Sequence, residues 1–161
     1  YPTFASQSLD GLESTMMLWA AWYERATGFL YWDTTSWTDG DPWGPNDDYG
    51  KTGDGMLIYP GNHDGLLAPA GSPTDVAIDG PIPSYRLKMV RMGLQDFALF
   101  QLAQQENLGE FTREQLHAVY HWWGGCDWDG CAVPEDDFFW TTDEAAMQSI
   151  RAAIAAAISR G

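Results

Sequence analysis

The chain has 161 residues, of which 45% are hydrophobic and 14% aromatic, so it can form one globular domain with a sizeable core. Its formal net charge of −15 repels phosphate backbones and anionic lipid surfaces, so we expect neither nucleic acid nor an anionic membrane surface as a partner. The sequence contains no apolar run of about 18 residues, and no membrane span is therefore predicted.

The first predicted elements are a helix and a strand. Residues 9–26 carry apolar side chains at helical spacing, and Gly28 suits the end of that helix. The following run, 28–32, is Gly-Phe-Leu-Tyr-Trp, which is compact, apolar and typical of a buried strand. This strand would end at Trp32 and Asp33.

A long loop, 36–55, is expected next. Loops of this length are usually functional or disordered, and Trp37 and Trp43 argue against disorder because large aromatic rings need a surface to cover. Residues 56–59 then form a second short apolar run between Gly-Asp-Gly and Pro-Gly, which predicts a second buried strand.

Ser84 is a good N-cap for a long amphipathic helix over residues 85–105. Gly93 lies in the middle of this helix at a cost of about 1 kcal/mol relative to alanine, which a close approach to a strand would explain. Two apolar strands, each next to a helix, indicate a parallel α/β sheet. Because two strands cannot make a covered sheet, we expect the remaining strands to come from sequence upstream of Tyr1 or from another chain.

The C-terminal third is predicted to be helical. One helix is expected over residues 112–123 with Thr112 as its cap, and an Ala-rich helix from about 142 to 159. Between them, Cys126 and Cys131 are separated by four residues, which allows a small disulfide loop, with two free thiols as the alternative. A disulfide and an acidic surface would suit an extracellular, periplasmic or cell-surface location.

An ordered set of short motifs carries a family resemblance. The motifs are Gly-Phe-Leu-Tyr-Trp at 28–32, Asp41-Pro42-Trp43, Gly53-Asp54-Gly55, Tyr59-Pro60-Gly61, and Pro83-Ser84-x-Arg86-Leu87-Lys88-x-x-Arg91-x-Gly93-x-x-Asp96. Together they resemble the C-terminal part of the catalytic domain of glycoside hydrolase family 123, also known as the domain of unknown function 4091 family. The resemblance covers residues 1–105, and no motif in residues 106–161 matches.

The resemblance implies an α/β fold, namely the C-terminal portion of a (β/α)8 TIM-type barrel followed by a helical extension. Residues 1–105 would supply the closing βα units, with 28–32 and 56–59 as the last two strands. Residues 106–161 would be the helical extension with the Cys-Cys loop. Active sites of such barrels lie at the C-terminal ends of the strands.

The resemblance also implies an activity, the hydrolysis of a terminal β-linked N-acetylhexosamine of the N-acetylgalactosamine type. In substrate-assisted catalysis the sugar's acetamido oxygen attacks the anomeric carbon, a glutamate protonates the leaving oxygen and an aspartate orients the acetamido group. That pair would lie on an earlier strand, so no catalytic residue is predicted in this chain. The chain alone is expected to be inactive. The resemblance implies no cofactor. The alternatives are a non-catalytic glycan-binding or structural part of a larger surface protein, and a free-standing small α/β binding protein.

The predicted substrate-binding residues follow the two strand ends. An aromatic face suits the C–H face of a sugar ring, although loop aromatics often anchor their own loop instead. The predicted set is Trp32, Asp33, Trp37, Trp43, Tyr59 and His63. Arg86, Arg91 and Asp96 are expected to have structural roles. No metal is predicted, because His117 and His121 share a helix face without a third ligand.

Overall fold

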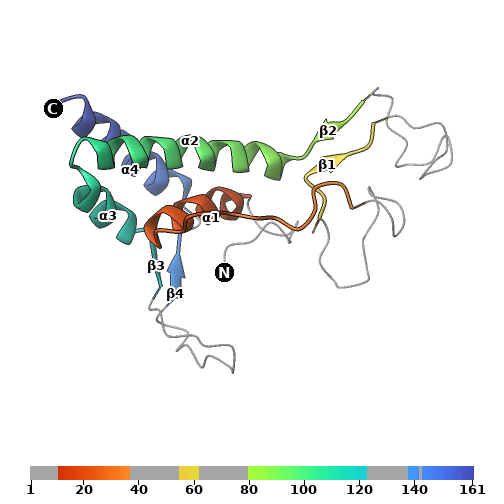
Figure 1. Cartoon of the computed structure of the whole chain (residues 1–161), viewed down its shortest axis with the longest axis horizontal. Coiled ribbons are helices and arrows are strands. Elements are labelled where there is room, and N and C mark those ends of the chain that lie inside the picture. Colours follow the sequence, from red (N-terminus) through yellow and green to blue (C-terminus); the bar gives the residue numbers. More distant parts are fainter. Residues whose placement is uncertain (1–10, 37–54, 62–79, 123–137, 142) are drawn as a thin grey trace.

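The computed structural model of the chain describes residues 11–36, 55–61, 80–122, 138–141 and 143–161. In chain order its elements are α1 (Leu12–Tyr23), β1 (Ile58–Tyr59), β2 (Ile82–Pro83), α2 (Tyr85–Gln105), α3 (Gly109–His117), β3 (Tyr120–Trp122), β4 (Phe138–Trp140) and α4 (Glu144–Ile158). The fold is therefore mixed helix and sheet, mostly helical with short strands (Figure 1). Within the described residues, no helix combines the length and apolarity that crossing a membrane requires.

Helix α2 runs along the molecule and organises the other elements. The β1–β2 ribbon lies at its N-terminal end, α3 and α4 lie toward its C-terminal end, and α1 lies alongside it (Figure 1). The Oγ of Ser84 accepts a hydrogen bond from the Leu87 N–H at 3.0 Å, which caps the first turn. The predicted helix over 85–105 is confirmed with these bounds.

The close contact between α1 and α2 explains Gly93. A Cβ atom at Gly93 would lie 3.0 Å from the Leu18 Cβ and 3.0 Å from the Thr15 carbonyl oxygen. In the same contact, the Thr15 hydroxyl donates a hydrogen bond to the Met89 carbonyl at 3.0 Å. The predicted close approach to a strand is wrong, because the neighbour is helix α1; the missing side chain lets the two helix backbones come together.

One hydrophobic core joins the two halves of the chain. Trp19 of α1 meets Phe100 of α2 edge to face, with ring centroids 5.1 Å apart. The same core includes Leu116 of α3 and the α4 side chains Met147 and Ile154, all fully buried. The helices within 106–161 therefore pack directly on α1 and α2.

A buried carboxylate adds a polar tie between three helices. Asp96 of α2 accepts a hydrogen bond from the Trp19 indole N–H at 2.8 Å. It also accepts two from Arg151 of α4, whose Nε and Nη2 lie 2.8 and 2.7 Å from the two carboxylate oxygens. The guanidinium carbon of Arg151 lies 5.2 Å from the Trp19 ring centroid. Arg151, Asp96 and Trp19 therefore each contact the other two.

The strands differ from the prediction. Residues 28–32 form no strand, and Leu30 is 85% exposed. Within the described residues, the nearest β-pairing to this run is an antiparallel bridge between Thr35 and Met56, which lies just after it. The second predicted strand is confirmed only over Ile58–Tyr59, and it pairs antiparallel with β2. The predicted parallel pairing is therefore wrong for the described strands.

The predicted helix over 112–123 is wrong at both ends. Helix α3 begins at Gly109, and Thr112 lies inside it with its N–H bonded to the Leu108 carbonyl at 2.9 Å. The aromatic segment after it forms β3, which pairs antiparallel with β4 through Tyr120 and Trp140. Aromatic residues favour a paired strand over a helix when a partner is present. The last helix, α4, is confirmed, and Asp143 caps it.

We predict that Gly93→Val lowers the free energy of unfolding by about 2–3 kcal/mol, because the new side chain collides with Leu18 and Thr15. Ala98→Val is the matched control: position 98 is exposed on the same helix, so this change carries the helix-propensity cost alone. Urea unfolding followed by tryptophan fluorescence measures both. Equal losses in the two variants would contradict the tight helix contact.

We predict that Asp96→Ala lowers the free energy of unfolding by about 3 kcal/mol, because it leaves the Arg151 guanidinium buried without its carboxylate. Adding Arg151→Met to that variant should recover part of the loss, because an apolar side chain needs no partner there. The two variants are compared by the same unfolding experiment. A double variant less stable than Asp96→Ala would show that the cost does not come from the orphaned charge.

Candidate functional site

The candidate site lies where the segment after α1 meets β1. Thr34 accepts hydrogen bonds on its carbonyl from the Leu57 and Ile58 N–H groups at 2.9 and 3.0 Å, and the Ser36 N–H donates to the Gly55 carbonyl at 3.0 Å. The Ser84 N–H donates to the Leu57 carbonyl at 2.8 Å and so joins the start of α2 to the same place. Residues 34–36, 55–58 and the first turn of α2 therefore form one hydrogen-bonded unit.

Trp32 lies on this unit as a braced, exposed ring. A Cβ atom at Gly55 would lie 2.6 Å from Cζ2 of Trp32, so the indole rests on the Gly55 backbone. Gly55 has φ of +73°, a conformation that favours glycine, and its N–H donates to the Tyr31 hydroxyl at 2.6 Å. The Trp32 side chain is nevertheless 61% exposed. An exposed indole held from behind is suited to stacking on a ligand ring.

Asp33 shapes the turn that follows Trp32. Its Oδ1 accepts hydrogen bonds from the N–H groups of Thr34 and Thr35 at 2.6 and 3.0 Å. A carboxylate engaged with two backbone donors fixes the local chain direction. Asp33 therefore holds the segment that carries the Trp32 ring and meets β1.

Tyr59 is placed differently from Trp32. Its side chain is buried, with 8% exposed, and its hydroxyl accepts a hydrogen bond from Nη2 of Arg86 at 3.2 Å. Stacking by Tyr59 stays a prediction. The structure gives this residue a second role, because its hydroxyl helps to hold the Arg86 guanidinium.

Arg86 is the residue of this site whose position was not predicted. It is 7% exposed, and Nη2 also donates to the Met56 carbonyl at 2.6 Å. Its Nε and Nη1 are buried and have no hydrogen-bond partner in the described part of the chain. A buried unpaired donor costs about 1–3 kcal/mol, so a hydrogen-bond acceptor from outside the described residues would stabilise Arg86 here. The sequence did contain a signal: a cation in the first turn of a helix opposes the helix dipole and calls for another reason to be there.

The other predicted residues lie outside the described residues. These are Trp37, Trp43 and His63, and the cysteines of the predicted disulfide, Cys126 and Cys131. The structure brings together Trp32, Asp33 and Tyr59 around β1, with Arg86 as the addition. Within the described ranges, no group of three potential metal ligands comes together.

Comparisons with known proteins support the family resemblance. The family model of the glycoside hydrolase 123 catalytic domain matches residues 3–72, and no curated protein matches the chain. A solved structure of a family 123 glycoside hydrolase from Clostridium perfringens, described in terms of glycolipid glycan hydrolysis, is similar with a TM-score of 0.61 and 20% sequence identity. The similarity covers 99% of this chain and 25% of that one.

The chain thus contains a segment like the catalytic domain of this family, as the sequence motifs indicate, and spans about a quarter of the length of the Clostridium enzyme. The structural similarity reaches beyond residue 105 into the C-terminal helices, where the sequence shows no motif. A barrel is not visible in the described elements, which comprise four helices and two two-stranded ribbons.

We predict that Arg86→Lys lowers the free energy of unfolding by about 1–3 kcal/mol, because a lysine ammonium cannot reproduce the planar fork that reaches both Met56 and Tyr59. Arg91→Lys is the matched control, since Arg91 is exposed on the same helix and should change stability by at most about 0.5 kcal/mol. Urea unfolding measures both. Equal stabilities of the two variants would contradict the assigned contacts.

Proposed function

We propose that this chain is part of a glycan-active domain that hydrolyses a terminal β-linked N-acetylhexosamine, of the N-acetylgalactosamine type, by substrate-assisted catalysis. The observation that carries the proposal is the match of residues 3–72 to the glycoside hydrolase 123 catalytic domain, within which Trp32 presents an exposed ring. In this proposal the chain supplies walls that bind the substrate. The general acid and the orienting carboxylate come from sequence outside the 161 residues.

The chemistry of Trp32 supports this division of roles. An indole face binds the C–H face of a sugar ring and excludes water from it, without taking part in proton transfer. The nearest acidic side chain in the sequence, Asp33, bonds two backbone N–H groups on one oxygen and serves the turn. The described site therefore offers a binding surface and a positioned guanidinium, and we assign proton transfer to the rest of the domain.

The exposed run around residue 30 supports a larger assembly. Phe29, Leu30 and Trp32 are all large and exposed, and contiguous apolar surface of this kind usually meets another surface. We propose that the remaining strands of a (β/α)8-type barrel cover the exposed side chains of Phe29 and Leu30. The barrel would leave the Trp32 ring at the substrate side. We further propose an extracellular, periplasmic or cell-surface location, where glycans of this kind are met.

A second candidate function is non-catalytic glycan binding as part of a larger surface protein. The observation that favours it is the same exposed Trp32, which suffices for binding without an adjacent acid pair. The two functions differ in turnover: the hydrolase releases the aglycone of an aryl β-N-acetylgalactosaminide, and the binding protein retains affinity without release.

We predict that Trp32→Ala, in a protein that joins this chain to the rest of its barrel, raises KM for an aryl β-N-acetylgalactosaminide about tenfold, which corresponds to about 1.4 kcal/mol of lost stacking. The thermal midpoint should hardly move, because the ring is mostly exposed. Leu94→Ala, which removes a similarly exposed apolar side chain on α2, is the control and should leave KM unchanged.

An unchanged KM in a folded Trp32→Ala variant would overturn the stacking role. Turnover by the 161 residues alone would overturn the placement of the acid outside the chain. Affinity for the glycoside without any turnover in the longer protein would favour the binding function over hydrolysis.

A further inference from the structure

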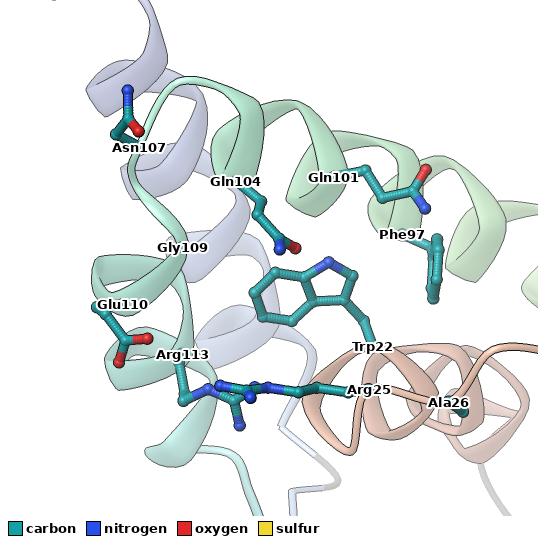
Figure 2. Close-up of a pocket in the computed structure, with 10 residues that line it drawn as sticks. All are labelled: Trp22, Arg25, Ala26, Phe97, Gln101, Gln104, Asn107, Gly109, Glu110 and Arg113. Atoms are coloured by element: carbon teal, nitrogen blue, oxygen red, sulfur yellow. The ribbon is translucent and has the colours of Figure 1, made fainter.

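A second candidate site lies at the opposite end of α2 from Trp32. An open cavity of about 570 Å³ lies between the end of α1, the C-terminal half of α2 and the start of α3 (Figure 2). This volume lies within the range of about 300–1,000 Å³ that is typical of small-ligand sites. The residues of α2 that line the cavity run from Phe97 to Gln104, so at about 1.5 Å per residue the cavity lies roughly 20–30 Å along the helix from its first turn.

Two arginines line this cavity in a strongly acidic chain. The sequence has 8 basic residues against 23 acidic ones, yet Arg25 and Arg113 both lie here. Neither forms an ion pair with a carboxylate of the described residues, whereas Arg151 pairs with Asp96. Glu110 also lines the cavity without pairing with either arginine. The guanidinium groups are thus available to an anion from outside this part of the chain.

Arg113 is held in place before any ligand arrives. Its Nη1 donates a hydrogen bond to the Tyr23 carbonyl at 2.8 Å, which satisfies an acceptor at the C-terminal end of α1. Its guanidinium carbon lies 4.8 Å from the Tyr23 ring centroid and 6.0 Å from the Trp22 ring centroid. A cation fixed by a hydrogen bond and two rings loses little freedom when it binds an anion.

Arg25 occupies a backbone position that normally suits glycine. Helix α1 ends in a Schellman motif, in which the Ala26 N–H bonds the Ala21 carbonyl at 2.8 Å and the Arg25 N–H bonds the Trp22 carbonyl at 3.0 Å. The motif places Arg25 at φ of +57°, in the left-handed region that a long side chain rarely adopts. A strained residue whose side chain lines a cavity points to a role beyond the turn itself.

Helix α2 ends in the same motif at the same cavity. The Leu108 N–H bonds the Ala103 carbonyl at 2.8 Å and the Asn107 N–H bonds the Gln104 carbonyl at 3.2 Å, with Asn107 at φ of +61°. Arg25 and Asn107 are the non-glycine residues with positive φ in the described segments, and both line this cavity. Each helix therefore ends with a polar residue at the left-handed position that glycine usually occupies.

The remaining walls combine an aromatic surface with amides. The Trp22 indole points between α2 and α3 toward Gln104, and the amides of Gln101 and Gln104 project from α2 on the same side (Figure 2). Phe97 continues the aromatic wall along α2. Amides pair with hydroxyl groups, aromatic surfaces contact sugar C–H groups, and a guanidinium forms a fork with a carboxylate.

We propose that this cavity is a second saccharide site that binds a sugar bearing a carboxylate, such as a uronic acid unit. Arg25 and Arg113 receive the carboxylate, and the amides of α2 receive the hydroxyl groups. A singly charged carboxylate is favoured over phosphate, because the field of a chain with net charge −15 opposes a more highly charged anion. The site does not depend on the hydrolase proposal, since none of its residues takes part in the Trp32 site.

The test is calorimetric titration of the intact chain with glucuronate, with glucose and inorganic phosphate as the comparison probes. Glucuronate should bind at least tenfold more tightly than either. Arg25→Gly should weaken glucuronate binding at least tenfold while leaving the thermal midpoint unchanged or higher, because glycine relaxes the left-handed turn. Arg91→Gln removes the same charge from an exposed position on α2 and should leave the affinity unchanged.

Several results would overturn the proposal. Equal binding of glucose would remove the role of the carboxylate, and equal binding of phosphate would make the cavity a general anion site. An affinity for glucuronate that Arg25→Gly leaves intact would place the sugar elsewhere. If a longer protein carrying this chain fails to bind glucuronate and is destabilised by Arg25→Gly, the occupant is an acidic side chain of that protein.

Discussion

Asp96 is the point on which the helical part of the structure depends. One carboxylate accepts hydrogen bonds from the Trp19 indole N–H and from Nε and Nη2 of Arg151, so α1, α2 and α4 meet at a single group. The packing around it is apolar, with Trp19 and Phe100 edge to face. Apolar packing alone tolerates sliding of one helix along another, whereas directional hydrogen bonds do not. Asp96 therefore fixes the register of the three helices.

The features that the sequence predicts correctly are those that depend on residues close together in the chain. Ser84 before an amphipathic run gives the start of α2, and the last helix was expected from about residue 142, where the structure shows Asp143 as its cap. The failures concern partners distant in sequence. Residues 28–32 have the composition of a strand but do not form one, and Tyr120 leaves a helical pattern because it pairs with Trp140 in a strand. Residue composition gives a preference for strand or helix, but whether a strand forms depends on pairing with a segment that is distant in the sequence.

The candidate site shows the same division. Trp32 and Asp33 were predicted from their place after an apolar run, and the structure adds the Gly55 backbone that braces the ring. Arg86 was predicted to be structural, but spacing could not show that its guanidinium would be buried against Met56 and Tyr59 with two donors unpaired. The cavity lined by Arg25 and Arg113 was not predicted, because it forms where the ends of α1 and α2 come together and no local sequence pattern indicates that contact.

The two ends of α2 explain why the C-terminal helices matter to a site they do not touch. At its first turn, α2 holds β1 through the Ser84 N–H to the Leu57 carbonyl and Arg86 to the Met56 carbonyl. At its other end, α3 and α4 fix its direction through the core and Asp96. Because α3 and α4 pack on the same helix whose first turn holds β1, we infer that they help to orient the unit that carries Trp32. Packing of this kind depends on side-chain volume more than on identity, and the structural likeness covers 99% of the chain although the family model stops at residue 72.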